Sequence, residues 1–419
     1  MVDYNVVVIG GGPAGLAAAH SAHKEGGKVL LIEREARLGG ILKQCIHDGF
    51  GLMWFKEKLS GPEYTERFID MVEGTDIEIM VLTFVINIVK VEEGYKITFV
   101  NRKGVTSVIT KTIVLATGCR ERTSRQISVQ GDRPAGILSA GTAQYYVNIL
   151  GKMPTKKCVI LGSGDIGLIM ARRLTLEGAE VVGVYEAKPT PSGLNRNIHQ
   201  CLKDFNIPLY LSHTVTKVFG KDRVEKVEIS KVDEKMTPIK GTEFIVDCDA
   251  LILSVGLIPE NEVASSINVK IDNRTKGPVT NQLFMTGTEG VFCCGNALHV
   301  NDLVDYVSES AVEAGINAAK YVQKEKSDIT IAAGKEFLYL VPQVIDIESG
   351  LDKCIEYFRV SKDIDGATLK VNVNGQEIFK KRYAHLRSTE MEKVVLDYTK
   401  CNLDKDSKIE FKLEGGELK

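Results

Sequence analysis

The feature that most constrains the fold of this chain is an apolar strand that runs into a glycine-rich turn and then a helix. Its first copy is the strand Tyr4–Ile9 followed by Gly10-Gly-Gly12-Pro13-Ala14-Gly15. At this spacing one glycine permits a tight turn, the next lets backbone N–H groups approach a pyrophosphate, and the third lets the helix pack on the strand. A second strand then ends in Glu33, about 20 residues on, where a carboxylate accepts from ribose hydroxyls. This copy predicts a dinucleotide-binding fold.

The pattern returns in full in the middle of the chain. The strand Lys157–Leu161 leads into Gly162-Ser-Gly164-Asp165-Ile166-Gly167, and a following strand ends in Glu186. Glu186 would repel a 2′-phosphate and accept from a 2′-hydroxyl, which favours NAD(H) over NADP(H). Lys188 lies close by and weighs in the other direction. Two complete copies predict two dinucleotide sites in one chain.

Three shorter pieces assign the flavin to the first copy. A strand ending in Ala116-Thr117-Gly118, and its repeat over 250–259 with Gly256, are predicted to be crossing points between domains. The strand that ends at Gly295-Asn296 precedes a helix from about Asp302 to 323, which would aim its N-terminus at the flavin.

The order of these pieces predicts an α/β protein with two nested Rossmann-like three-layer domains and a small mainly β C-terminal domain. Residues 1–125 and 245–328 form the expected FAD domain, with a β-meander at about 76–112. Residues 126–244 form an inserted NAD(H) domain, and residues 329–419 form the β domain, since short strands and turns dominate there.

Charge and cysteine patterns exclude several functions. The 53 basic and 55 acidic residues nearly cancel and form no block, so we expect no nucleic-acid partner. No apolar run of about 18 residues is present, so we expect no transmembrane segment and a cytoplasmic protein, with peripheral membrane attachment left open. None of the nine cysteines has the two-residue spacing of a zinc or iron–sulfur site, so no metal is expected.

The pieces, in this order, resemble the two-dinucleotide-binding flavoproteins of the pyridine nucleotide-disulfide oxidoreductase superfamily over residues 1 to about 325. Further similarity over 39–51, 116–122, 133–144, 194–197 and 296–305 is to the bacterial FAD- and NAD-dependent subunit that accompanies a glycerol-3-phosphate dehydrogenase or oxidase. The resemblance implies FAD and NAD(H) as cofactors. It gives flavin-site roles to Gly10, Gly12, Gly15, Glu33, Arg34, Gly40, Gly118, Gly295 and Asn296. Asn296 stands where the superfamily has Asp, and its amide can still accept a hydrogen bond.

The dithiol of the disulfide reductases is missing. The resemblance would put its two cysteines near positions 42 and 47, which hold Leu42 and His47. Cys45 lies between them, where a helix N-terminus could make it a thiolate, although burial against the flavin is the favoured interpretation. His47 could donate to the flavin or act as an acid or base.

Two more groups are candidates near the cofactors. His299 and Asp302 are expected to meet the pyrimidine edge of the flavin. Tyr145 and Tyr146 could gate the nicotinamide, although core packing is the commoner use of such side chains.

Three functions follow in order of preference. The first is an electron-transferring subunit that exchanges hydride between NAD(H) and FAD and serves a partner dehydrogenase subunit and a small electron-carrier protein. The second is a stand-alone NADH oxidase, peroxidase or disulfide reductase that uses Cys45. The third is a flavin-stabilised assembly protein. Homo-oligomerisation stays open.

Overall fold

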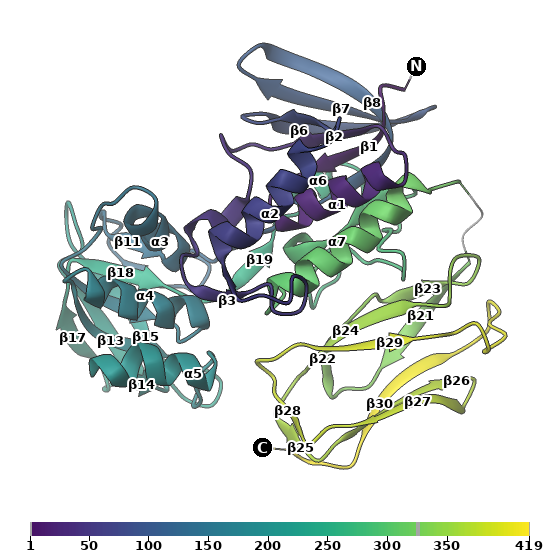
Figure 1. Cartoon of the computed structure of the whole chain (residues 1–419). Helices are drawn as coiled ribbons and strands as arrows, with labels where there is room; N and C mark the ends of the chain where they lie inside the picture. The colour runs from purple at the N-terminus through teal and green to yellow at the C-terminus, as the bar shows by residue number, and fades with distance from the viewer. Residues whose placement is uncertain (1, 324–326, 419) are drawn as a thin grey trace. The chain divides into compact units, whose positions relative to one another are not determined.

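The computed structural model describes residues 2–323 and 327–418 and divides the chain into two compact units (Figure 1). Unit 1 comprises Met1–Cys119 and Pro259–Lys419, and unit 2 is the inserted segment Arg120–Ile258. Where the chain passes between them, β9 (Cys119–Glu121) pairs with β19 (Leu257–Pro259). Among the described residues, no helix has the length and apolar character needed to cross a bilayer.

The inserted unit is longer at both ends than the predicted 126–244. The segment 245–253 was expected to return to the first domain, but it supplies two strands to unit 2. β17 (Phe244–Asp247) pairs with β16, and β18 (Ala250–Leu253) lies between β11 and β12. All four residues of β18 are buried. An apolar strand of this kind needs cover on both faces, which the centre of a parallel sheet provides.

Unit 1 is built on a sheet in the order β5-β2-β1-β8-β7-β6, with β20 paired to β8. The strands β5, β2, β1, β20 and the end of β8 run parallel, as expected for βαβ connections. The strands of this sheet are β1 (Tyr4–Ile9), β2 (Val29–Ile32), β5 (Glu78–Met80), β6 (Phe84–Val91), β7 (Gly94–Asn101), β8 (Gly104–Leu115) and β20 (Val291–Cys293).

The long strand β8 joins a parallel sheet to an antiparallel meander. Its last residues pair with β1, whereas its first residues pair antiparallel with β7, and Thr110 faces Tyr4 on one side and Tyr95 on the other. The meander therefore consists of β6, β7 and β8. The run 77–81, which was expected to belong to it, instead forms the parallel strand β5 beside β2.

Two helices far apart in sequence pack side by side on this sheet (Figure 1). They are α1 (Pro13–Lys24), which is rich in buried alanines, and α7 (Val304–Ala319). The two helices are in close contact at Gly315, where an added Cβ would lie 2.2 Å from the Ala18 carbonyl oxygen. The other elements of unit 1 are η1 (Gly40–Gln44), β3 (Asp48–Phe50), β4 (Leu59–Ser60), α2 (Gly61–Glu73), α6 (Glu262–Ser265) and η4 (Gly295–Ala297).

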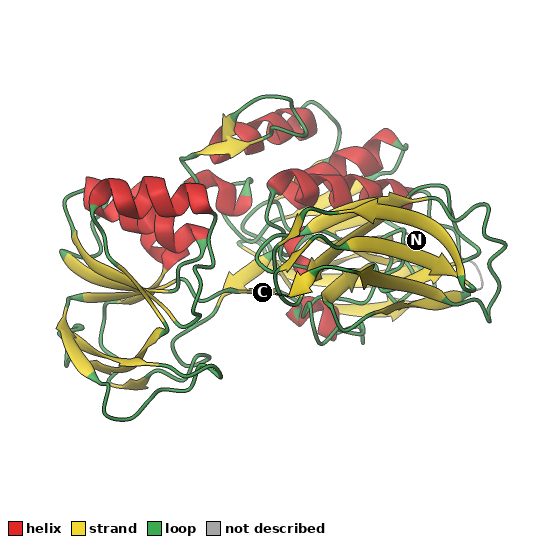
Figure 2. Cartoon of the chain, turned by 90° about the horizontal axis from the view of Figure 1, so that it is seen from below, coloured by secondary structure: helices red, strands yellow, loops and turns green. Residues whose placement is uncertain are grey.

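Unit 2 has three layers, with helices on one face of a five-stranded parallel sheet and a second sheet on the other (Figure 2). The alternation along β12 (Lys157–Leu161) explains the layers. Cys158 and Ile160 join the core under α3 and α4, whereas Val159 and Leu161 join the core between the sheets.

The elements of unit 2 fall into two sheets and the helices that cover them. The remaining strands of the parallel sheet are β11 (Ile137–Ser139), β13 (Glu180–Glu186), β14 (Leu209–Leu211) and β18. The second sheet contains β10 (Gln130–Gly131), β15 (His213–Phe219), β16 (Lys226–Lys231) and β17. The helical elements are α3 (Ala140–Asn148), α4 (Asp165–Leu176), α5 (Asn195–Asn197), η2 (Ile198–Leu202) and η3 (Lys203–Phe205).

The C-terminal segment is made of strands with a core of their own. It contains three sheets, in the orders β23-β21-β30-β26-β27, β22-β24-β29 and β28-β25-β31. Their strands are β21 (Asp328–Ala333), β22 (Phe337–Val341), β23 (Val344–Asp346), β24 (Cys354–Val360), β25 (Ile364–Asp365), β26 (Thr368–Val373), β27 (Gln376–Arg382), β28 (His385–Leu386), β29 (Glu392–Leu396), β30 (Ile409–Glu414) and β31 (Glu417–Leu418).

Strand β24 explains why this segment belongs to unit 1 and not to a separate unit. Cys354 and Phe358 face the core of the β segment itself. The intervening Ile355 and Tyr357 belong to the hydrophobic core of unit 1 that also contains α1 and α7. A strand that is apolar on both faces must be covered on both.

Strand β24 also buries a carboxyl group. Glu356 is fully buried, and neither carboxyl oxygen has a hydrogen-bond partner among the described residues. Burial therefore raises the pKa of Glu356 well above its usual range.

We predict that Glu356→Gln changes the pH dependence of unfolding. Because the folded-state pKa is raised, the stability linked to this group is fully present below its ordinary pKa of 4.5 and is lost as the pH rises toward the folded-state value. Over that window the wild type should lose about 1.4 kcal/mol per pH unit relative to the variant. Urea unfolding between about pH 5 and about pH 8 measures the difference. Glu390→Gln, at an exposed position of the same segment, is the control. Equal slopes for wild type and Glu356→Gln would contradict the prediction.

Candidate dinucleotide-binding sites

The turn between β1 and α1 needs two of its glycines for the chain's own packing. Gly10 has φ +111°, and a Cβ there would lie 2.3 Å from the Ala116 carbonyl oxygen. A Cβ at Gly15 would lie 1.7 Å from the Gly10 carbonyl oxygen. These contacts are too short for any other residue, so Gly10 and Gly15 fix the turn against β8 and the helix.

Gly12 is different, because the chain itself has room for a side chain there. Its backbone is extended, with φ −78° and ψ −175°, and the nearest atom to a Cβ is the Gly40 Cα at 3.7 Å. Helix α1 starts at the next residue, Pro13, and no side chain caps its first turn. Its first N–H groups therefore lack an acceptor from within the helix. A glycine that packing does not require, in front of an uncapped helix, fits a pyrophosphate.

The turn between β12 and α4 divides its glycines in the same way. Gly162 has φ +98°, and a Cβ there would lie 2.0 Å from the Ser254 carbonyl oxygen; a Cβ at Gly167 would lie 2.7 Å from the Gly162 carbonyl oxygen. At Gly164 the nearest atom to a Cβ is the Ser254 Oγ at 3.6 Å, and α4 also starts without a side-chain cap. Both turns thus leave their middle glycine open to a ligand.

Each predicted acid is hydrogen-bonded to the glycine turn of its own unit. Glu33 is buried and accepts from the Gly11 N–H at 2.6 Å and from the Glu35 N–H at 2.7 Å. Glu186 is also buried and accepts from the Ser163 N–H at 3.0 Å and the Ser163 Oγ at 2.6 Å. A carboxylate has about four acceptor positions, so Glu33 keeps capacity for ribose hydroxyls.

The structure adds serines that the sequence did not single out. Ser192 donates its hydroxyl to Glu186 at 3.1 Å, and its N–H donates to the Ser163 Oγ at 2.9 Å. Asp165, a predicted cofactor contact, accepts from the Leu194 N–H at 2.9 Å and from the Asn197 Nδ2 at 2.7 Å. The loop after β13 is therefore fastened to the start of α4. The Asp165 side chain is engaged by these bonds, so the predicted cofactor contacts of Asp165 and Ile166 are left to their backbone N–H groups.

Other predicted flavin-site residues gather around the first turn. The 39–40 turn packs on it, since the Gly39 N–H donates to the Gly11 carbonyl and a Cβ at Gly40 would lie 2.9 Å from the Gly12 Cα. Thr117 donates its hydroxyl to the Glu260 carbonyl at 2.6 Å. Gly118 has φ +72° and no atom within 4 Å of a Cβ, as befits an open turn.

Gly295 and Asn296 also lie by the start of α1. A Cβ at Gly295 would lie 2.8 Å from the Ala14 Cβ. The Asn296 amide oxygen, which was expected to accept from the flavin side chain, accepts from the Asn301 N–H at 3.0 Å and from the Asn301 Nδ2 at 3.2 Å. Its amide nitrogen donates to the Cys119 Sγ at 3.5 Å.

Asp302 and His299 are engaged by the C-terminal segment. Asp302 accepts from the Arg359 guanidinium at 2.5 Å and from the Met391 N–H at 2.6 Å. His299 is buried, with its ring centroid 5.8 Å from that of Tyr339 and 5.3 Å from that of Tyr357. Burial and the Arg359 charge lower the pKa of His299 to about 3. This arrangement favours structural roles for both residues.

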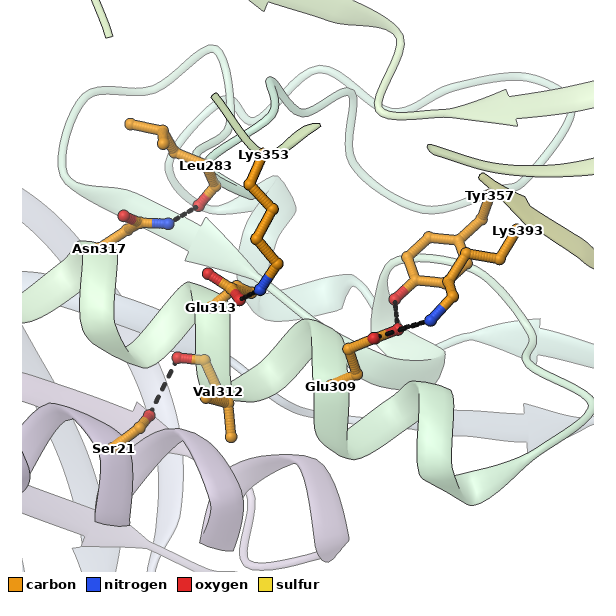
Figure 3. A network of polar contacts seen from close by, with 9 residues as sticks. All are labelled: Ser21, Leu283, Glu309, Val312, Glu313, Asn317, Lys353, Tyr357 and Lys393. Carbon is orange, nitrogen blue, oxygen red and sulfur yellow. Dashed lines mark hydrogen bonds and ion pairs between the residues drawn. The ribbon is translucent and has the colours of Figure 1, made fainter. Parts of the chain in front are cut away.

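Helix α7 is fastened to the C-terminal segment by charged groups (Figure 3). Glu309 accepts from the Tyr357 hydroxyl at 2.9 Å and from the Lys393 ammonium at 2.8 and 3.0 Å. One turn further on, Glu313 pairs with Lys353 at 2.5 Å.

On its opposite side α7 is held by the body of unit 1 (Figure 3). Ser21 of α1 donates to the Val312 carbonyl at 3.1 Å. Asn317 lies one turn beyond Glu313, on the same side of the helix as Glu313, and its Nδ2 donates to the Leu283 carbonyl at 3.3 Å. Helix α7 is thus fixed from two sides.

The geometry does not support Cys45 as a redox centre. Its side chain is buried and donates to the Ile41 carbonyl at 3.4 Å, and burial raises the pKa of the thiol to about 12. His47 is half-buried, with Nδ1 3.3 Å from the Asp48 carbonyl oxygen and its ring 5.0 Å from that of Phe50. The nine cysteines, all within the described residues, form no disulfide. Within the described ranges, no three potential metal ligands come together.

The family's sequence model for pyridine nucleotide-disulphide oxidoreductases matches residues 4–311. The chain belongs to this family. Membership implies oxidoreductase chemistry with FAD and a pyridine nucleotide, and Gly12 and Gly164 are the positions in each turn that fit those ligands.

Among curated proteins, the chain is similar to ferredoxin–NADP reductases. The protein from Streptococcus pneumoniae serotype 2 (strain D39) is 26% identical over 332 residues, which cover 77% of this chain and 96% of the relative. The protein from Leuconostoc mesenteroides is 26% identical over 325 residues, or 75% and 91%.

Solved structures of family members share the fold. Thioredoxin reductase of T. acidophilum has a TM-score of 0.62 and 22% identity, covering 76% of this chain and 98% of that one. Bacillithiol disulfide reductase from Bacillus cereus has a TM-score of 0.61 and 20% identity over the same shares. These likenesses confirm the predicted α/β fold with two nested nucleotide-binding domains. The relatives named here bear reductase names, and none is a glycerol-3-phosphate dehydrogenase subunit, so that part of the predicted resemblance is without support.

We predict that Gly12→Ala and Gly164→Ala each weaken the binding of a different cofactor. Both variants should fold, because the chain has room for each Cβ, but Gly12→Ala should lose FAD. Gly164→Ala should keep FAD and bind the pyridine nucleotide at least about tenfold more weakly, or about 1.4 kcal/mol. Flavin absorbance after gel filtration and anaerobic nucleotide titration measure the two effects. Gly287→Ala, where a Cβ also meets no atom within 4 Å, is the matched control. Unchanged cofactor binding in both variants would refute the ligand role of these glycines.

A second prediction concerns Cys45. Because the pKa of its thiol is raised to about 12, Cys45 should resist iodoacetamide at about pH 8 in the folded enzyme and react after unfolding. Cys45→Ala should keep turnover within about twofold of wild type, since a buried thiol makes a poor nucleophile. Peptide mass spectrometry after timed alkylation gives the first result, and steady-state assays give the second. Rapid labelling of native Cys45, with loss of turnover in the variant, would point instead to a thiol-based mechanism.

Proposed function

We propose that this chain transfers hydride between NADH, bound by unit 2, and FAD, bound by unit 1, and exchanges the electrons with a partner protein. The observation that carries the proposal is the matched pair of open glycines, Gly12 and Gly164, each in front of an uncapped helix. When bound, the two cofactors supply the redox chemistry, and the chain supplies binding, orientation and electrostatics.

The residues of each site act through their charges and backbone dipoles. Backbone N–H groups at the starts of α1 and α4 would donate to the two pyrophosphates, and the partial positive charge of each helix end favours the bound anion. Glu33 would accept from ribose hydroxyls, because it lies beside its turn and has acceptor positions to spare. Glu186 already accepts from Ser163, Ser192 and the Lys188 N–H, so it would act on the nucleotide through its negative charge. No side chain near either turn needs to gain or lose a proton for these contacts.

Glu186 supports NADH as the preferred nucleotide. It is buried and anchored by Ser163 and Ser192, so it cannot swing away from a 2′-phosphate without breaking those bonds. A phosphate brought against a fixed carboxylate would be repelled. The names of the ferredoxin–NADP reductases favour NADP for those relatives, and the exposed Lys188 of this chain is the group that would have to offset the repulsion here.

The partner is proposed to be an electron carrier and not a thiol substrate. Thioredoxin and bacillithiol disulfide reductases are among the structural neighbours. In this chain, however, Cys45 has a raised thiol pKa, and no C-x-x-C sequence is present. A dehydrogenase subunit, such as one for glycerol 3-phosphate, is a further candidate that rests on the sequence resemblance alone.

The test is anaerobic stopped-flow of the purified FAD-containing protein with NADH and, separately, NADPH. We expect NADH to bleach the oxidised flavin band at about 1 per second or faster, and NADPH to do so with an apparent Kd at least about tenfold higher. Bleaching by neither nucleotide would refute the proposed function. Preference for NADPH would refute the role given to Glu186 while leaving hydride transfer in place.

A further inference from the structure

Helix α3 and the residues just after it expose a group of large apolar side chains. We call Tyr145, Tyr146, Ile149, Leu150 and Met153 the α3 patch, and each is between 38% and 44% exposed. The four-residue spacing of Tyr145 with the C-cap residue Ile149 puts these two on one side of the helix, and Leu150 lies in the turn just after it. The chain after the helix folds back on its last turn, because the Leu150 and Lys152 N–H groups donate to the Tyr145 and Tyr146 carbonyls.

The α3 patch is distinct from the face of α3 that packs in the core. The opposite face already packs in unit 2, where Ala140, Ala143 and Val147 are buried in the core that also contains α4 residues. A surface helix normally shows polar residues on its outer side. An outer side with five large apolar residues in a stretch of nine is typical of a docking surface.

Basic residues flank the α3 patch along the chain. Residues 120–157 contain seven Lys and Arg but only two acidic residues, in a chain whose net charge is −2. Two of the seven are engaged elsewhere, since Arg133 donates to backbone carbonyls of 129–132 and Lys157 pairs with Glu180. One of those acids, Glu121, accepts from the Gly141 N–H at the first turn of α3, and the exposed Arg122 follows it. At the other end the exposed Lys152 lies four residues beyond Asn148, the last residue of the helix, and the exposed Lys156 follows.

We propose that the α3 patch and its basic rim bind a small, negatively charged electron-carrier protein, an inference that rests on the proposed function. An apolar centre with a charged rim is the usual form of a protein docking surface, and a basic rim steers an acidic partner toward it. A second copy of this chain fits less well, because a twofold contact through this face would bring two basic rims together. With a one-electron carrier, two reduced carriers, one NAD⁺ and one proton give two oxidised carriers and one NADH.

The test uses the FAD-containing full chain and two assays. The first follows NAD⁺ reduction by a reduced [2Fe–2S] ferredoxin of negative net charge. The second follows NADH oxidation by menadione, a small neutral acceptor that needs no docking surface. The variants are Ile149→Ser with Leu150→Ser, and Lys152→Gln alone. Val105→Ser, at an exposed apolar position of unit 1, is the matched control.

We expect kcat/KM for ferredoxin to fall about tenfold or more in the double variant, and less in Lys152→Gln, with the wild-type rate decreasing as salt rises. Menadione turnover should stay within about twofold in every variant. Ferredoxin rates that match wild type in both variants would overturn the inference, as would a wild type that uses menadione but no acidic carrier. A wild-type dimer that dissociates in the double variant would assign the surface to a second copy and also overturn it. A wild-type protein that does not oxidise NADH with menadione would instead contradict the proposed function itself.

Discussion

A backbone N–H can hydrogen-bond a phosphate only if no side chain stands between them, and this requirement shapes both nucleotide-binding units. In each, a parallel strand delivers the chain to a turn, and a helix begins beyond it without a capping side chain. The outer glycines of each turn are fixed by contacts within the chain, whereas Gly12 and Gly164 are not. The strand and helix on either side of each turn fix its position, and Glu33 and Glu186 accept hydrogen bonds from the residues next to these two glycines.

Sequence reasoning succeeded where the determining contacts are local. The two glycine turns, their helices and Glu33 and Glu186 lie within segments of about 30 residues, the size of a βαβ unit. The hydrogen bonds from Gly11 to Glu33 and from Ser163 to Glu186 show that each acid reaches the middle of its own turn. The anchoring of Glu186 by Ser192 is not predictable from the sequence, because it depends on how an irregular loop folds back.

The sequence was less informative where contacts span long separations. His299 and Asp302 lie just before α7, the helix that is expected to face the flavin, but their partners Tyr357 and Arg359 come from a strand that carries no motif. Likewise, the run 250–259 resembles the end of β8 and is predicted to be a domain crossing. The chain does return to unit 1 within this run, at Pro259, but residues 250–253 belong to unit 2. Only their pairing with β11 and β12 places them inside the parallel sheet of unit 2.

The C-terminal segment lies beyond residue 311, where the match to the family ends, yet it is bound into the first unit. Strand β24 contributes Ile355 and Tyr357 to the core that also contains α1 and α7. Charged pairs at Glu309 and Glu313 hold the outer side of α7, and Ser21 holds the inner side. The segment therefore steadies the helix that packs on α1, and so the surroundings of the first glycine turn.

The most direct test of this account is a crystal structure of the protein grown with FAD and NAD⁺. The account predicts one pyrophosphate against the backbone of Gly12 at the start of α1 and another against Gly164 at the start of α4, with ribose hydroxyls near Glu33 and Glu186. Either pyrophosphate bound away from its turn, or a turn left empty at saturating cofactor, would contradict it.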